Sequence, residues 1–576
     1  MPRRPWSFSL TLLLLGLLGL TLLAPIYAVV RAGFVESDGR FTLSHFHWVL
    51  TDDLYLEGLW NSVWLALWTT VLCLVVSIPL ALLAEHYSFA GRRWWLALVQ
   101  VPMILPPFVG AIGLKGLLSR NGGINLLLMH WGLIDPSQPI DFLKYPFWSC
   151  VVLEALYLYP ITFLNVQAAL ANIDPALEEA ARNLGSSPWR RFWTITLPLM
   201  RPGVFAGATI VFIWSFTELG TPLMVGFRAV TAVQVYDDLS TTNPAPETYA
   251  LVVVMLVASV LLYLVGKLVL GRPTAGMLAK ATVAAQPRRL GWPGTLAVTL
   301  PFAAVFTIAV LPHVAVVLGS ITSTGLIELA PEKLTLRFHS QLVSDVWQPG
   351  DATRNLAALS VVNSFKYSIL ATAVDLVLGF AIAYLVVRRR SWLTGLLDGL
   401  AMLPLAVPGL VMAFGYFVMT QGDGLFSALN PLRSATGTTV LLVVAYSVRR
   451  LPFLVRSCAA GLEQTSVALE EAAANLGARS LRTLGSIVVP LLTANFIAGG
   501  LLVFSRSMLE VSDSLILAFD KNAYPMTKAI YDLADNPNAG LQMASALGVW
   551  GMLLLVVTIV GASLALGKRL GALFRA

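Results

Sequence analysis

The chain has 576 residues, of which 57% are hydrophobic and only 12% are charged. A soluble domain carries about 25% charged residues, so this composition excludes a soluble globular protein and indicates one that crosses a membrane several times. The formal net charge of +7 would suit a nucleic-acid partner, but the placement of the basic residues explains it better, and no nucleic-acid partner is expected.

Runs of about 20 mainly apolar residues, the length that crosses a bilayer as a helix, recur along the whole chain. The first run follows Arg3 and Arg4 and resembles a signal peptide, but its length and the lack of a clear cleavage site favour a span. Residues 271–293 are basic, rich in Pro, Gly and Ala, and predicted to be a linker. We predict an all-α integral membrane protein with twelve spans, at residues 8–30, 60–84, 95–118, 146–170, 203–225, 248–270, 294–320, 362–387, 396–419, 437–458, 494–518 and 543–567.

Basic and acidic residues divide between the two sides of the predicted membrane. With the N-terminus inside, 24 of the 38 basic residues, Arg449 and Arg450 among them, fall on the inner side and 12 on the outer side. The acidic residues are distributed the other way, with 18 outside and 7 inside. Because Lys and Arg mark the cytoplasmic side of a membrane protein, both termini are predicted to be cytoplasmic.

The chain repeats itself in the same direction. Residues 176–185 and 468–477 match at nine of ten positions with an offset of 292 residues, and Glu218 and Glu510 are related by the same offset. Each half carries its central spans in one order and orientation, so we predict parallel repeats related by an axis along the membrane normal. The predicted domains are residues 1–280 and 281–576.

The repeated segment is predicted to be a short cytoplasmic helix between the fourth and fifth spans of each half. In the first copy, Pro175 suits the first turn, the acidic residues suit the positive end of the helix dipole, and Gly185 suits the stop. The second copy is predicted to begin at Thr465 or Ser466 and to stop at Gly477. A helix that merely joins two spans is the alternative, but two matched copies with a flat alanine face favour a docking surface.

These segments resemble the Glu-Ala-Ala loop of binding-protein-dependent ABC importer permeases, in which Glu-Ala-Ala is followed by a glycine and then by an apolar-Pro step. The length and the two fused halves resemble the permeases for ferric iron, thiamine and 2-aminoethylphosphonate. The resemblance implies that each loop docks on a separate ATPase subunit, so that one chain binds two copies. It assigns ATPase coupling to Glu178, Glu179, Ala180, Ala181 and Gly185 in the first half and to Glu470, Glu471, Ala472, Ala473 and Gly477 in the second.

The same resemblance implies an extracytoplasmic substrate-binding protein and a place in the bacterial inner membrane. The substrate that we favour from it is ferric iron, with thiamine and 2-aminoethylphosphonate as alternatives. No lysine is followed by Ser or Thr, so the chain has no phosphate-binding GxxxxGK[ST] loop and ATP hydrolysis must come from another chain. No catalytic set, cofactor or metal site is recognisable, and we expect no enzyme. A twelve-span secondary transporter is the distant alternative.

Prolines interrupt two predicted spans at matching repeat positions. Pro102, Pro106 and Pro107 fall in the third span, and Pro404 and Pro408 fall in the ninth. A proline inside a helix kinks or breaks it, so we expect breaks at both places. Such segments are candidate walls of a transport pathway, although simple packing kinks are an equal alternative.

Glu218 and Glu510 are expected inside the fifth and eleventh spans. A charged side chain at the bilayer centre costs at least ~2.5–3.5 kcal/mol, so such residues usually face a partner or a watery path. We predict that the two acids face each other across a central pathway and suit a cation. For Glu510, an ion pair with Arg506 four residues earlier is the alternative, whereas Trp214 occupies the matching place before Glu218.

Overall fold

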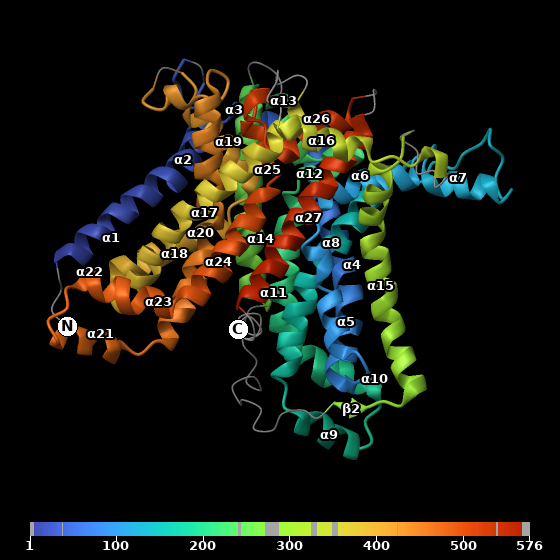
Figure 1. The fold of residues 1–576 in the computed structure, drawn as a ribbon, viewed down its shortest axis with the longest axis horizontal. Helices are drawn as coiled ribbons and strands as arrows, with labels where there is room; N and C mark the ends of the chain where they lie inside the picture. Colours follow the sequence, from blue (N-terminus) through green and yellow to red (C-terminus); the bar gives the residue numbers. More distant parts are fainter. Residues whose placement is uncertain are drawn as a thin grey trace.

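The computed structural model describes residues 5–36, 38–239, 244–270, 287–323, 331–347, 355–422, 424–536 and 540–566, nearly all of them in helices (Figure 1). Residues 271–286 of the predicted linker lie outside these ranges. The first half contains α1 (Pro5–Leu18), η1 (Gly19–Leu23), α2 (Ala24–Phe34), α3 (Ser44–Val49), α4 (Asp53–His86), β1 (Tyr87–Ser88), α5 (Arg92–Leu98), η2 (Val101–Met103), α6 (Pro107–Leu118), α7 (Gly123–His130), α8 (Pro146–Ala171), α9 (Pro175–Asn183), α10 (Pro188–Arg191), η3 (Phe192–Thr196), α11 (Leu197–Phe216), α12 (Gly220–Val225), α13 (Thr231–Leu239) and α14 (Pro246–Leu270).

The second half begins with β2 (Arg288–Arg289), which pairs in parallel with β1. It continues with α15 (Trp292–Ser320), η5 (Pro331–Lys333), α16 (Arg337–Trp347), α17 (Leu356–Arg388), α18 (Trp392–Met402), η6 (Leu403–Leu405), α19 (Gly409–Met419), η7 (Ser427–Leu429), α20 (Ala435–Gln464), α21 (Val467–Asn475), α22 (Ser480–Thr483), η8 (Leu484–Val488), α23 (Val489–Leu491), α24 (Thr493–Met508), α25 (Ser512–Leu517), η9 (Lys521–Ala523), α26 (Met526–Ala534) and α27 (Gly540–Leu566).

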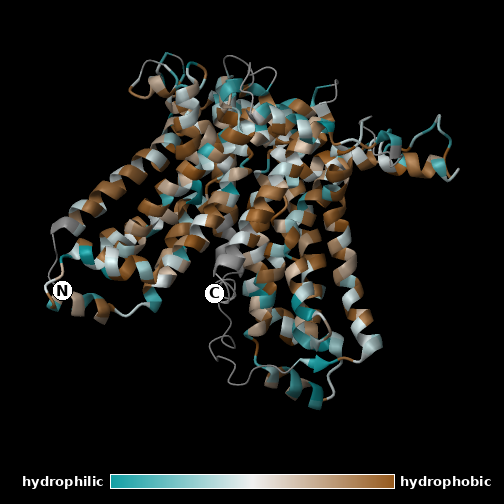
Figure 2. Cartoon of the chain, viewed as in Figure 1, coloured by the Kyte–Doolittle hydropathy of each residue, from teal (hydrophilic) through white to brown (hydrophobic). Residues whose placement is uncertain are grey.

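The described helices are long and apolar enough for a polytopic membrane protein (Figure 2). Eight of them meet the length and composition of a span, and three bent pairs raise the number to eleven. The remaining predicted span corresponds to α14, whose described apolar part, Pro246–Leu262, is shorter. The all-α membrane fold is therefore confirmed.

The proline-containing spans are broken, as expected. The segment Arg92–Met103 meets Pro107–His130 at 88°, and Trp392–Leu405 meets Gly409–Met419 at 103°. A proline lacks the N–H that continues a helix, and its ring clashes with the preceding turn. A third bend, of 73°, separates Ser480–Leu491 from Thr493–Met508.

The two halves share one packing scheme. In the first half α8 packs against α4 and α11, and in the second half α20 packs against α17 and α24 in the same way. The helices α9 and α21, here called the motif helices, lie at one end of the molecule, here called the motif end (Figure 1). The helices α13 and α26 lie at the opposite end, where the halves come together.

The first helix of each half packs against the other half. α15 contacts α6, and α2 contacts α19. Two repeat-related glycines allow this approach: a Cβ on Gly113 would lie 1.7 Å from the carbonyl oxygen of Pro312, and one on Gly415 would lie 2.7 Å from that of Pro25. The first helix of each half therefore packs closely against the other half, with backbone in contact with backbone.

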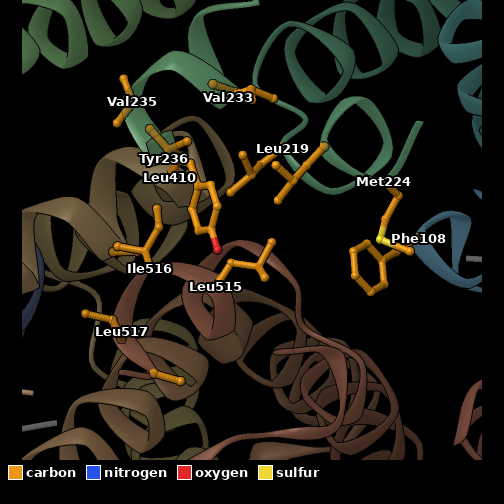
Figure 3. Close-up of a cluster of buried hydrophobic side chains, with 14 of the residues drawn as sticks. Phe108, Leu219, Met224, Val233, Val235, Tyr236, Leu410, Leu515, Ile516 and Leu517 are labelled. Atoms are coloured by element: carbon orange, nitrogen blue, oxygen red, sulfur yellow. The ribbon is translucent and has the colours of Figure 1, made fainter. Parts of the chain in front are cut away.

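A buried apolar cluster joins the two halves (Figure 3), and it includes residues of α13, at the end opposite the motif helices. Phe108, Leu219 and Met224 come from the first half, and Leu410 and Leu515 come from the second. Burial of such side chains stabilises by about 1.5–3 kcal/mol each. The cluster therefore closes the molecule firmly at that end.

Candidate functional site

The motif helices begin and end where the sequence predicts. Asp174 caps α9 by accepting the Ala176 N–H at 2.9 Å, and Ser466 caps α21 in the same way. Gly185 and Gly477 follow the helices with φ of 79° and 81°, in the left-handed region that favours glycine. In α9 the Ser186 N–H bonds the Ala181 carbonyl at 3.0 Å, which is the hydrogen bond of a glycine-terminated helix stop.

The first glutamate of each motif turns back to its own half. Glu178 accepts a hydrogen bond from Thr196 at 2.7 Å and contacts His86 Nε2 at 3.2 Å. The hydrogen bond with His86 is the largest influence that lowers the pKa of the Glu178 carboxyl below its ordinary value. These contacts hold α9 to the end of α4 and to η3, so Glu178 does not present its carboxylate outward.

Glu470 holds α21 more firmly. Its carboxylate accepts hydrogen bonds from Arg388 Nε at 2.7 Å and from the Tyr384 hydroxyl at 2.9 Å. The Arg388 and Glu470 side chains are 8% and 13% exposed, whereas those of His86 and Glu178 are 42% and 26% exposed. The two motif helices are therefore attached by different chemistry.

The outward face of each motif helix carries the second glutamate and the first alanine of the motif. Glu179, Ala180, Glu471 and Ala472 are exposed, Ala181 is half-buried and Ala473 is buried. Two leucines were not singled out from the sequence, although they lie inside the repeat. Leu184 is 88% exposed and Leu476 is 89% exposed. The two exposed leucines occupy matching places next to the stop glycines of the two motif helices.

A cavity of about 1950 Å³ separates the two halves. It reaches from Glu463, next to the end of α20 and close to α21, to Val511 in the break after α24. Its walls include the broken segments, through Pro106, Pro107, Pro404 and Pro408. The cavity therefore lies between the motif helices, and the apolar cluster closes its far end.

Glu218 and Glu510 both line this cavity, but they are not inside continuous helices as expected. α11 ends at Phe216 and α12 begins at Gly220, while α24 ends at Met508 and α25 begins at Ser512. Glu218 Oε1 accepts the N–H groups of Gly220 at 3.2 Å and Thr221 at 3.3 Å. The carboxylate thus caps the short helix that follows the break.

Glu510 is held between two arginines of α20. Its carboxylate pairs with Arg449 at 2.5 Å and also with Arg450, and Arg449 reaches the buried Asp513 at 3.0 Å. Both arginines lie in the middle of α20, so their assignment to the cytoplasmic side was wrong. Sequence reasoning missed them as cavity residues, together with Glu154, which accepts a hydrogen bond from Ser215.

The predicted alternative of an Arg506–Glu510 ion pair is also wrong. Arg506 donates a hydrogen bond to the Tyr157 hydroxyl at 3.0 Å, and its guanidinium lies 5.8 Å from the ring centre of Trp214. Helix α24 ends at Met508, so Arg506 and Glu510 do not share a regular turn. Both partners of Arg506 belong to the other half, and a contact so distant in sequence leaves no local pattern.

Some residues at corresponding positions of the two repeats contact each other at the boundary between the halves. Trp214 and Arg506 are 292 residues apart, the offset of the repeat. Tyr236 and Tyr531 are each the sixth residue of their helix, and their ring centres lie 6.0 Å apart. Equivalent residues of two related halves touch only close to the axis that relates them. Arg506 therefore lies near the middle of the cavity.

Within the described ranges, no group of three or more His, Cys, Asp or Glu side chains is placed to hold a metal ion. The cavity surface offers guanidinium, carboxylate, phenol and indole groups instead. Such a surface suits contact with a polar or charged molecule.

Comparison with known proteins adds to this geometry. The family model of the binding-protein-dependent transport system inner membrane component matches residues 77–273 and 375–571.

The ferric transport system permease protein FbpB of Actinobacillus pleuropneumoniae is 27% identical over 516 residues, which cover 88% of this chain and 69% of that protein. The Fe(3+)-transport system permease protein FbpB 2 of Haemophilus influenzae is 26% identical over 522 residues, 90% of each chain. The spermidine/putrescine transport system permease protein PotB of Escherichia coli is 32% identical over 205 residues, 34% of this chain and 73% of that protein.

Proposed function

Because this chain belongs to the binding-protein-dependent transport system inner membrane components, we propose that it forms the pathway of an ATP-driven importer and couples it to two separate ATPase subunits. The observation that carries the proposal is the pair of matched motif helices on either side of the cavity. Each helix presents an exposed leucine and is fastened to its half by a glutamate. Movement of the helices would therefore move the walls of the cavity.

The coupling residues of the proposal are those of the two motifs. Glu178 and Glu470 fix the helices, Gly185 and Gly477 end them, and the outward residues around Ala180 and Ala472 meet the ATPase. The ATPase subunits supply all hydrolysis, and this chain itself is no enzyme. Approach of the two ATPase subunits draws α9 and α21 together, closes the cavity at the motif end and opens the far end to an extracytoplasmic binding protein.

The proposed orientation puts the motif end and both chain termini in the cytoplasm of a bacterial cell. The basic residues of the motif end and the start of α1 at that end support it (Figure 1). We keep the proposed division of the chain into two domains near residue 280. The first helix of each domain packs against the other domain.

The proposed substrate is ferric iron, supported by the similarity to ferric permeases along most of the chain. Thiamine and 2-aminoethylphosphonate remain the alternatives. We place Glu218 and Glu510 in the pathway because both line the cavity near its closed end. A secondary transporter is disfavoured, since it would need no docking helices.

Copurification tests the assembly. The chain should purify with the ATPase encoded beside it at two copies per chain, measured by native mass spectrometry. Uptake of ⁵⁵Fe(III) into proteoliposomes with ATP and the binding protein then tests the substrate. One ATPase per chain would contradict the coupling assignment, and uptake of labelled thiamine or 2-aminoethylphosphonate in place of iron would replace the substrate.

A further inference from the structure

We infer that Arg506, with Tyr157 and Trp214, forms an anion-recognition site in the central cavity, and that the transported substrate presents a negatively charged oxygen group to it. The inference rests on the proposed function and names the substrate class of that pathway. The ligand chemistry is that of a phosphonate, phosphate or carboxylate. Such a group can belong to an organic substrate or to an anion that accompanies a ferric ion.

Arg506 differs from its neighbours in the cavity by its partners. Arg449 and Arg450 pair with Glu510, and Arg456 pairs with Asp398 at 3.3 Å. Among the residues that the structure describes, no carboxylate lies within ion-pair distance of Arg506. Its side-chain partners are a phenol and an indole ring, which orient the guanidinium without neutralising it.

The guanidinium is prepared for a ligand. It has five N–H donors, and one of them is hydrogen-bonded to the hydroxyl oxygen of Tyr157. Its planar fork matches the oxygens of carboxylate and phosphate groups. Arg506, Tyr157 and Trp214 all line the cavity, and they lie near the axis between the halves, where a substrate must pass.

A bare cation fits this part of the cavity poorly. The Glu510 carboxylate is already shared by two arginines, and Glu218 Oε1 accepts two backbone N–H groups. The described residues also assemble no set of three metal-ligating side chains. If iron is the cargo, it therefore crosses within an anionic complex.

Equilibrium dialysis of the full chain in detergent tests the inference without any ATPase. The probes are 2-aminoethylphosphonate, ⁵⁵Fe(III) citrate and, as a cation, thiamine. We expect one of the two anionic probes to bind, and R506Q to weaken that binding at least about 10-fold, because it removes a charge-assisted hydrogen bond to the anion. Binding of 2-aminoethylphosphonate identifies an organic anion, and binding of ferric citrate alone identifies a metal complex.

R456Q is the matched control, because it removes the same charge from an arginine that has its own carboxylate partner and is 58% exposed. It should leave binding within about 2-fold. If R506Q is poorly folded, R506K keeps the positive charge but loses the planar fork, and it should bind the same probe more weakly than the wild type. Unchanged binding by R506Q, an equal loss in R456Q, or failure of both anionic probes to bind would overturn the inference. Copurification of the ATPase is measured separately. If the chain recruits the ATPase but binds no anionic probe, the anion site is contradicted and the proposed function is not.

Discussion

Lys528 in α26 donates a hydrogen bond from Nζ to the hydroxyl of Tyr236 in α13 over 3.0 Å, and so joins the two halves at the end opposite the motif helices. The same ammonium lies 5.5 Å from the ring centres of Tyr236, Tyr524 and Tyr531. Each such cation–π contact contributes about 0.5–2 kcal/mol. The contacts hold the far end closed.

We predict that K528M favours opening of that end. In the proposed transport cycle the two tyrosine-bearing helices must separate before substrate enters. Loss of the cation should raise ATPase activity in the absence of binding protein by about 3- to 10-fold. K144M is the control, since Lys144 stacks on the ring of its neighbour Tyr145, away from α13 and α26. Unchanged basal activity in K528M would rule out this contact as part of the gate.

Replacing Gly185 or Gly477 by Val should uncouple transport from ATP hydrolysis. No atom lies within 4 Å of a Cβ at either glycine, so the cost comes from the positive φ alone and is about 1–2 kcal/mol or more. The helix stop would shift while the spans stay folded. Gly132, with φ of 67° away from both motifs, is the control. Full uptake by the double variant would contradict the coupling role.

The two motif helices should respond differently to loss of their glutamates. E470Q leaves the buried Arg388 without its charged partner, which costs several kcal/mol, about 3–5. E178Q removes a partly exposed contact that contributes less than about 1 kcal/mol. Hydrogen exchange of the α9 and α21 peptides measures the effect. Equal exchange in the two variants would contradict the difference in attachment.

The Glu178 contact should also be lost in acid. Because the folded state lowers the pKa of this carboxyl, its stabilising effect is complete above the ordinary glutamate pKa and disappears as the pH falls through the lowered value. The protection of α9 against exchange, corrected for the intrinsic pH dependence of amide exchange, should therefore decrease as the pH falls below the ordinary glutamate pKa, more in the wild type than in E178Q. A pH response of the same size in E178Q would assign it to another group.

Substitution of Glu218 and of Glu510 should distinguish a role in the transport pathway from a role in stability. E510Q leaves Arg449 and Arg450 short of negative charge and should lower the melting temperature strongly, with partial rescue by the added change R450Q. E218Q weakens only a helix cap, at about 0.5–2 kcal/mol, and should reduce uptake in a well-folded chain. Unchanged uptake in E218Q would leave Glu218 as a capping residue.

Gly113 and Gly415 should be intolerant of alanine. At Gly113 the added Cβ would lie 1.7 Å from a backbone oxygen, and at Gly415 2.7 Å, so G113A should destabilise more than G415A. At Gly395, where no atom lies within 4 Å, alanine should be neutral or stabilise by up to about 1 kcal/mol. Melting curves in detergent give the order. Equal stability of all three variants would argue against the close helix exchange.

The sequence was most informative where structure follows from local chemistry. The ends of α9 and α21 depend on Asp174, Ser466 and two glycines, all within a few residues of the helices they bound. The prolines likewise break the spans in which they occur. Each of these features has its cause nearby in the chain.

Contacts between the halves could not be predicted in this way. The breaks at Glu218 and Glu510 depend on carboxylates that hydrogen-bond the next helix, or on arginines from α20. The partners of Arg506 lie 349 residues away, at Tyr157, and 292 residues away, at Trp214. A hint was present in the Arg449–Arg450 pair inside an apolar span, since two adjacent charges there require a buried partner.

A permease built from two identical chains would place the same residue on both sides of its axis. Two arginines would then repel each other at the site where Arg506 stacks on Trp214, and two tryptophans would offer no charge. When the two halves are joined in one polypeptide, each has its own sequence. A residue on one wall of the cavity can then be substituted without changing the matching residue on the other wall. The cavity thereby carries a guanidinium at Arg506 and an indole at the matching place, Trp214, so that the two ends of the proposed anionic substrate would meet different surfaces there.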